Sequence, residues 1–209
     1  MQRRMKMRIV STFMSLCLVT AAGISRADSP RQALLAQDAA ARSGNVDADL
    51  EFYQAKGDKQ EKLAQAIARG DVALAKLQDA VAKRFGPELA TAVIHAAGTE
   101  DAHDIEAAEE KIESDQATVE FKDHSTPVHM VRVDGKWKVS LSDMLGEATD
   151  LQVDQLTKNI TDFTIEVGRL TSLVDNQKFR SGEGVRDRVA ELHDRLFKTD
   201  APPAGGQGV

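Results

Sequence analysis

The chain has 209 residues, of which 27 are Lys or Arg and 33 are Asp or Glu, and its formal net charge at neutral pH is −6. A single cysteine, Cys17, is too few for an iron–sulfur cluster or a cysteine-based zinc site. An acidic surface repels the phosphates of nucleic acids and of anionic lipid headgroups, so we expect neither as a partner.

The N-terminus has the organisation of a secretory signal. Four basic residues precede an uncharged, largely apolar run at residues 9–24, and residues 25–27 (Ser-Arg-Ala) offer small side chains at both positions that a signal peptidase reads. The run is shorter than the ~20 residues that span a bilayer as a helix, although a retained membrane anchor is the alternative. We predict a signal peptide over residues 1–27, an exported (periplasmic or secreted) protein, and no membrane span after cleavage.

Cleavage would change both the charge and the redox chemistry of the chain. The signal takes Cys17 and five basic residues with it, which leaves 22 basic and 33 acidic residues and a formal net charge of −11. The remaining protein has no disulfide and no thiol nucleophile. We expect a single domain over residues 28–198, held together by its core alone.

The first part of this domain is predicted to be helical, over residues 30–113. Ser29-Pro30 has the form of an N-cap followed by proline at the first helical position. This start predicts a short helix to about residue 42. A second short helix is expected over residues 49–56, where Gly57 ends it.

A longer helix follows. Apolar residues recur at spacings of three and four from Leu63 to Val81, which is typical of one buried helix face. The sequence Phe85-Gly86-Pro87 ends this helix and starts the next, which runs to Gly98. A further helix is expected over residues 100–113.

Residues 115–142 change to a period of two, and we predict three antiparallel strands there. Apolar side chains alternate with polar ones from Ala117 to Phe121, as in a half-buried strand. Asp134-Gly135 lies between two β-rich runs and specifies a two-residue type I′ hairpin. The resulting register pairs Val133 with Lys136, Arg132 with Trp137, Met130 with Val139 and Val128 with Leu141. Arg132 then lies beside Trp137, where a cation–π contact is expected.

Two helices are predicted over residues 149–198, followed by a disordered tail at 199–209. The first is the longest element of the chain, from about Thr149 to Asn176, and its apolar residues keep the three-four spacing throughout. Threonines rather than charges flank this stripe, which favours packing against the chain's own helix at residues 63–81 over a coiled-coil dimer. We therefore expect a monomer.

Motifs for catalysis, metals and cofactors do not stand out. The five histidines are scattered, so we predict no metal site, no catalytic residues and no cofactor. An enzyme would need His124, His129 or a pair of carboxylates in a cleft with perturbed pKa values. If the protein instead binds a ligand, we expect the core face of the hairpin to contribute Trp137, Met130 and Val139.

Residues 117–141 (A-T-V-E-F … V-H-M-V-R-V-D-G-K-W-K-V-S-L) resemble the closing hairpin of NTF2-like, or cystatin-like, domains. The resemblance implies a helix laid across a curved sheet, in a superfamily whose members include binders of small apolar ligands and enzymes. No active-site residue of that superfamily maps onto this chain. The layout as a whole is also similar to uncharacterised exported bacterial proteins with a late F-R-S-x-E segment, here residues 179–183.

The predicted fold class is α+β and predominantly helical: a bundle with two long amphipathic helices and a small three-stranded antiparallel sheet. The predicted function is that of a non-catalytic interaction or structural protein of the cell envelope, with an unknown protein partner. The alternatives are an NTF2-like module that binds a small apolar ligand and a hydrolase-type enzyme.

Overall fold

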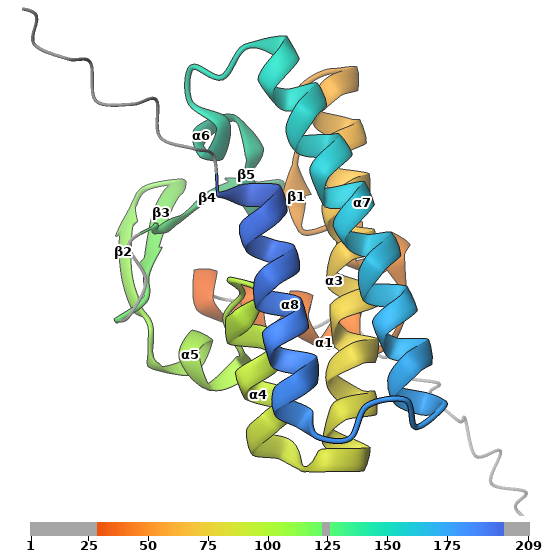
Figure 1. Ribbon diagram of the computed structural model, residues 1–209. Helices are drawn as coiled ribbons and strands as arrows, with labels where there is room; N and C mark the ends of the chain where they lie inside the picture. Colours follow the sequence, from red (N-terminus) through yellow and green to blue (C-terminus); the bar gives the residue numbers. More distant parts are fainter. Residues whose placement is uncertain (1–28, 123–125, 199–209) are drawn as a thin grey trace, which may run out of the picture.

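The computed structural model describes residues 29–122 and 126–198, so the predicted signal peptide and C-terminal tail lie outside the described residues. A sheet occupies one side of the molecule and upright helices the other (Figure 1). The elements in chain order are α1 Pro30–Arg42, α2 Val46–Leu50, β1 Tyr53–Gln54, α3 Asp58–Phe85, α4 Pro87–Ala96, α5 Ala102–Ala107, β2 Glu109–Glu113, β3 Gln116–Glu120, β4 Val128–Val133, β5 Lys136–Ser140, α6 Leu141–Leu145, α7 Asp150–Asp175 and α8 Gly182–Phe197. The prediction of a predominantly helical α+β protein is confirmed.

Helix starts follow the capping signals of the sequence. The Ser29 side chain accepts a hydrogen bond from the backbone N–H of Gln32, with Pro30 at the first helical position. Thr149 and Gln152 form a reciprocal capping box at the start of α7. Helix α7 has the extent that its apolar spacing predicts, and α3 contains the whole predicted stripe from Leu63 to Val81, although Gly57 gives its start no side-chain cap.

Helix α7 packs along α3 within the chain. A Cβ atom placed on Gly70 of α3 would lie 3.4 Å from the hydroxyl oxygen of Thr164 on α7, so glycine allows the two helices to approach closely here. The half-buried hydroxyl of Thr164 donates to the carbonyl of Ile160. The threonines thus widen the buried stripe as predicted, while the monomeric state stays a prediction.

The sheet has five strands in the order β1-β5-β4-β3-β2, which corrects the prediction of three antiparallel strands. The β4–β5 register pairs Met130 with Val139 and Arg132 with Trp137, as predicted. Asp134 and Gly135 both have positive φ angles, of 51° and 76°, as a type I′ turn requires. The ladder does not extend to Val128 and Leu141, because Leu141 starts α6.

Both extra strands come from segments predicted as helix. The helix expected over residues 100–113 ends at Ala107, and Glu109–Glu113 pairs with β3 as an edge strand in which Ile112 is 52% exposed. The helix expected over residues 49–56 begins and ends earlier, as α2, because Asn45 caps it. Tyr53–Gln54 then pairs in parallel with β5. In both cases pairing with a neighbouring strand outweighs local helix propensity.

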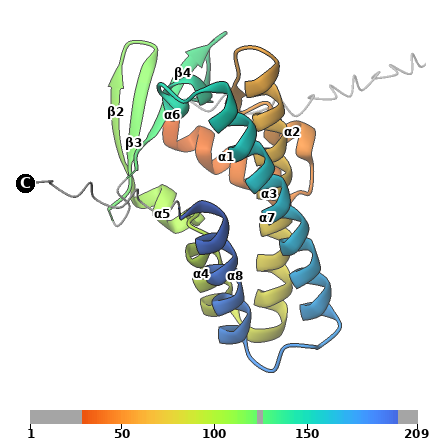
Figure 2. The same cartoon turned by 45° about the horizontal axis from the view of Figure 1, so that its top comes forward.

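The apolar core of the described residues forms two large clusters that share α3, and a small third cluster of Ala41, Val72 and Ala75. One cluster packs the sheet against α1 and the first half of α3, and it contains Trp137 and Met130. The other packs the second half of α3 against α4, α7 and α8. Figure 2 shows α4 beside α8 and α3 beside α7, in the half of the molecule away from the sheet. Among the helices of the described residues, none has the length and apolarity to cross a bilayer.

Candidate functional site

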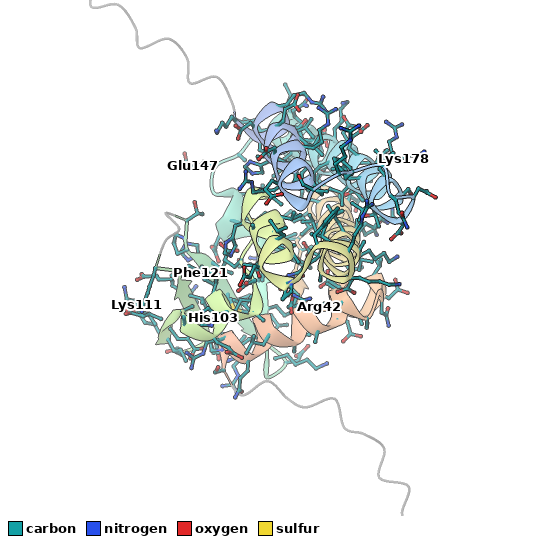
Figure 3. The ribbon with its side chains drawn as sticks, turned by 60° about the horizontal axis from the view of Figure 1, so that its bottom comes forward. Arg42, His103, Lys111, Phe121, Glu147 and Lys178 are labelled. Atoms are coloured by element: carbon teal, nitrogen blue, oxygen red, sulfur yellow. The ribbon has the colours of Figure 1, made fainter. Side chains whose placement is uncertain are left out.

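A cavity of about 380 Å³ lies at the junction of the two core clusters. Its wall is mainly apolar and draws on α1, α3, α4, α5 and the sheet; side chains from both clusters that line it are Leu34, Leu74, Ile94, Ile105, Phe121 and Val139. Figure 3 labels two lining residues, Phe121 on the sheet side and Arg42 at the end of α1. The cavity therefore lies where residues of the sheet approach α1, α3 and α4.

Two carboxyl groups, which we call the Asp49–Asp71 pair, lie in the wall on the side of α1, α2 and α3. Asp71 is half-buried and accepts hydrogen bonds from the Tyr53 hydroxyl (2.6 Å) and from the Gln37 amide (3.4 Å). Asp49 is 0% exposed, and no donor among the described residues approaches either of its carboxylate oxygens. The neighbour of Asp49 is the carboxyl of Asp71, which can form a hydrogen bond with it when one of the two is protonated.

Local sequence explains how the two carboxyls meet. The Asn45 side chain accepts from the backbone N–H of Ala48 and starts the five-residue helix α2, which packs on α3 with Asp49 in its last turn. Asp71 follows Ile67 by four residues and precedes Leu74 by three, so it lies on the buried face of α3. That position within an apolar stripe is the signal that identifies Asp71 from sequence, and our sequence-based search missed it.

Burial dominates the electrostatics of the pair. It raises the pKa of Asp49 to about 8, and repulsion from the charges of Asp71 and Asp38 adds to the rise. It also raises the pKa of Asp71, to about 6, although the hydrogen bonds from Tyr53 and Gln37 oppose the increase. The two groups titrate as a pair. Near neutral pH the pair therefore holds one proton, which the higher pKa of Asp49 favours on that carboxyl.

Of the three predicted ligand-binding residues, Val139 lines the cavity. Trp137 and Met130 are packed in the core beside it, 3% and 2% exposed. The predicted cation–π contact is present, with the Arg132 guanidinium 5.6 Å from the centre of the Trp137 ring. The hairpin thus supplies two wall residues, Val139 and Val128, and the second was not among the predicted three. The polar part of the site comes from the helices and β1.

The histidines named as catalytic candidates lie away from the cavity or outside the described residues. His129 is exposed on β4, with its ring 3.4 Å from the Thr118 hydroxyl. His124 lies outside the described residues. The carboxylate pair that an enzyme would need is present, as Asp49 and Asp71, although it was not identified from sequence.

A second polar cluster could offer metal ligands. Ligand atoms of His95, Asp101 and Asp104 lie within 4.8 Å of one another. Their hydrogen bonds already serve the fold, because Asp101 and Asp104 form the capping box of α5 and His95 contacts Asp104 at 2.8 Å. This cluster is explained by helix capping.

The resemblance of residues 117–141 to NTF2-like hairpins stays a prediction. Comparison of the chain with protein-family models, with curated proteins and with solved structures gave no match. The function of the cavity therefore has to be inferred from its own geometry and chemistry.

Proposed function

We propose that the cavity binds a small, mainly apolar molecule and that the protein is an exported small-molecule-binding module. The observation that carries this proposal is the cavity of about 380 Å³ between the two core clusters. A cavity of this size falls within the ~300–1,000 Å³ typical of ligand pockets.

The wall fits a particular kind of molecule. Most of it is apolar, and a polar group on one side joins Gln37, Tyr53 and Asp71 by hydrogen bonds. Ligand pockets combine an apolar lining with a few convergent polar groups that fix the orientation of the ligand. An apolar body with a single polar end would match this division.

A binding role agrees with the predicted non-catalytic character of the protein. The prediction of an interaction or structural role in the cell envelope stays open beside it. The predicted signal at residues 1–27 would place the cavity outside the cytoplasm, where a binding module meets molecules that enter from the surroundings.

Acid–base catalysis by the Asp49–Asp71 pair is the second candidate function. The observation that favours it is the difference between the two pKa values, about 8 and about 6, because one protonated and one ionised carboxyl divide the roles of acid and base. We rank it second because the cavity alone carries the binding proposal, whereas catalysis requires in addition that the reacting atoms of a bound molecule meet both carboxyls. Its test is turnover of any bound molecule, followed by mass spectrometry, in the wild type and in Asp71→Asn.

The binding proposal is tested with a neutral fluorescent probe, N-phenyl-1-naphthylamine, titrated into protein stripped of bound molecules by unfolding and refolding. Ala75 lines the cavity, and Ala66 is an equally buried alanine of α3, both 7% exposed. Ala75→Leu should weaken probe binding about tenfold or more, as small changes in apolar pockets do. The control Ala66→Leu should leave it unchanged.

A native mass spectrum of the protein purified from its own compartment provides an independent test. A bound molecule that is detected as extra mass on the wild type and is absent from Ala75→Leu would support the cavity as the binding site. The proposal is overturned if the wild type binds no probe, or if Ala75→Leu binds it as well as Ala66→Leu does. Thermal melting of each variant establishes that it is folded before binding is compared.

A further inference from the structure

We propose that the cavity selects ligands that carry a cationic amine and that the Asp49–Asp71 pair accepts this group. The inference rests on the proposed binding function and adds the chemical class of the ligand. Three features of the wall lead to it: an unpartnered buried carboxyl, an excess of negative charge and a fixed acceptor.

The unpartnered carboxyl is Asp49. It is 0% exposed, it lines the cavity, and no donor among the described residues reaches its oxygens. Buried polar groups in proteins are nearly always hydrogen bonded, so an exception is expected to have a functional explanation. A ligand ammonium would bring three N–H donors and a positive charge to this position.

Negative charge dominates the wall. Of the cavity-lining residues, which all belong to the described part of the chain, four are acidic and one, Arg42, is basic. The Arg42 guanidinium donates to Asp38 at 2.8 Å, so these two charges offset each other and the remaining acidic residues carry the excess. The acidic lining residues are Asp38, Asp49, Asp71 and Glu100. A cavity of this charge favours a cation over a neutral or anionic group.

Asp71 provides a fixed acceptor. The Tyr53 hydroxyl donates to it, and the Gln37 amide donates both to Tyr53 and to Asp71. These hydrogen bonds hold the Asp71 carboxylate in one orientation before a ligand arrives, which reduces the entropy lost on binding. An alcohol could donate to Asp71 as well. Its hydroxyl has a single donor and no charge, so Asp49 would still lack a hydrogen-bond donor.

Proton release should accompany amine binding. Burial keeps a proton on Asp49 near neutral pH, and an ammonium beside the pair would displace it. Amine affinity should therefore rise with pH between about 6 and 8. The other titratable or charged groups that line the cavity with the pair are Asp38 and Arg42 from α1, Tyr53 from β1 and Glu100 from the α4–α5 connection.

The test compares n-octylamine with 1-octanol, two molecules of the same length, as competitors of the neutral probe N-phenyl-1-naphthylamine at pH 7.5. Octylamine should displace the probe at a concentration about tenfold lower, as expected when a charge-assisted hydrogen bond replaces a neutral one. Asp71→Asn should abolish this advantage and Asp49→Asn should reduce it. Asp187→Asn, an exposed aspartate on α8, should leave it unchanged.

The outcomes separate the two proposals. Equal displacement by amine and alcohol, or an amine advantage that survives both pair substitutions, overturns the cation inference and leaves the apolar cavity standing. Failure of the wild type to bind the probe overturns the binding function itself. Calorimetry of octylamine binding to the wild type in two buffers of different ionisation enthalpy needs no variant, and binding near pH 7 without proton release would also overturn the inference.

Discussion

The carboxyl of Asp49 lies beside that of Asp71, and among the described residues uncharged donors form hydrogen bonds with Asp71 but not with Asp49. This asymmetry decides which carboxyl keeps the shared proton, because hydrogen bonds to a carboxylate favour its ionised form. The arrangement costs stability when both groups are ionised, since two like charges are then buried together. Sites that bind ligands often retain such a cost in the unliganded protein.

The stability of the protein should therefore fall as the pH rises. The folded-state pKa values of both carboxyls lie above the value of 3.8 that an aspartate has in an unfolded chain. Their contribution is complete below about pH 4 and is lost as the pH rises through about 6 and about 8. Asp49→Asn removes one of these charges, so it should raise the free energy of unfolding by about 1–3 kcal/mol at pH 8.5 and change it little at pH 5.

Urea unfolding at pH 5, 7 and 8.5 measures this effect. The control Asp187→Asn removes an exposed carboxyl that pairs with Arg186 on the surface of α8, and it should change stability by about 0.5 kcal/mol or less at every pH. A pH dependence that is the same in Asp49→Asn and in the wild type would show that the pair is not the source.

The β4–β5 hairpin shows what the sequence alone can predict. Asp134-Gly135 can adopt two successive positive φ angles, and a two-residue turn leaves one register, so each pair up to Met130–Val139 followed from the turn. The long helices were predictable for a similar reason. Their apolar spacing is sustained over many turns, Gly86 ends α3, and a capping box starts α7.

The strands β1 and β2 were not predictable in the same way. Glu109–Glu113 contains a single apolar residue, Ile112, which is exposed, so no alternation of burial marks it as a strand. Tyr53–Gln54 is two residues long and owes its conformation to β5, more than 80 positions away along the chain. Both segments become strands through pairing with a neighbour that local sequence does not reveal.

The site was missed for a different reason. Asp71 could have been noticed, since a carboxyl on the apolar face of a helix such as α3 is rarely buried without a partner. Asp49 could not, because the five-residue helix α2 is too short to show a periodic face. The cavity itself arises where two core clusters meet without filling the space between them, and single-sequence patterns do not contain that information.

The contact between α7 and α8 gives a second prediction. The Phe163 ring is 5% exposed and meets Phe197 edge to face, with ring centres 5.7 Å apart and an interplanar angle of 67°. Phe163→Ala should lower the free energy of unfolding by about 3–5 kcal/mol, because it removes this contact and leaves a cavity. Ile165 of the same helix is 51% exposed, and Ile165→Ala should cost less than about 1 kcal/mol. Equal melting temperatures of the two variants would contradict the core position of Phe163.

The first residue of α8 gives the third prediction. Gly182 is buried against α4, and a Cβ atom there would lie 2.5 Å from Cδ1 of Leu89 and 3.1 Å from Cβ of Phe85. Gly182→Ala should therefore destabilise the protein by about 1–3 kcal/mol, as overpacking of a filled core does. Gly184 in the same turn is exposed, and the nearest atom to its Cβ position is Cδ1 of Phe179, 3.6 Å away.

Gly184→Ala is accordingly the matched control. It should leave stability unchanged or raise it by less than about 1 kcal/mol, because alanine favours the helix and meets no obstacle. Urea midpoints of both variants at one pH measure the difference. If Gly182→Ala proved as stable as Gly184→Ala, the N-terminus of α8 would have to move away from Leu89 at little cost, and the packing of α8 on α4 would be looser than the structure describes.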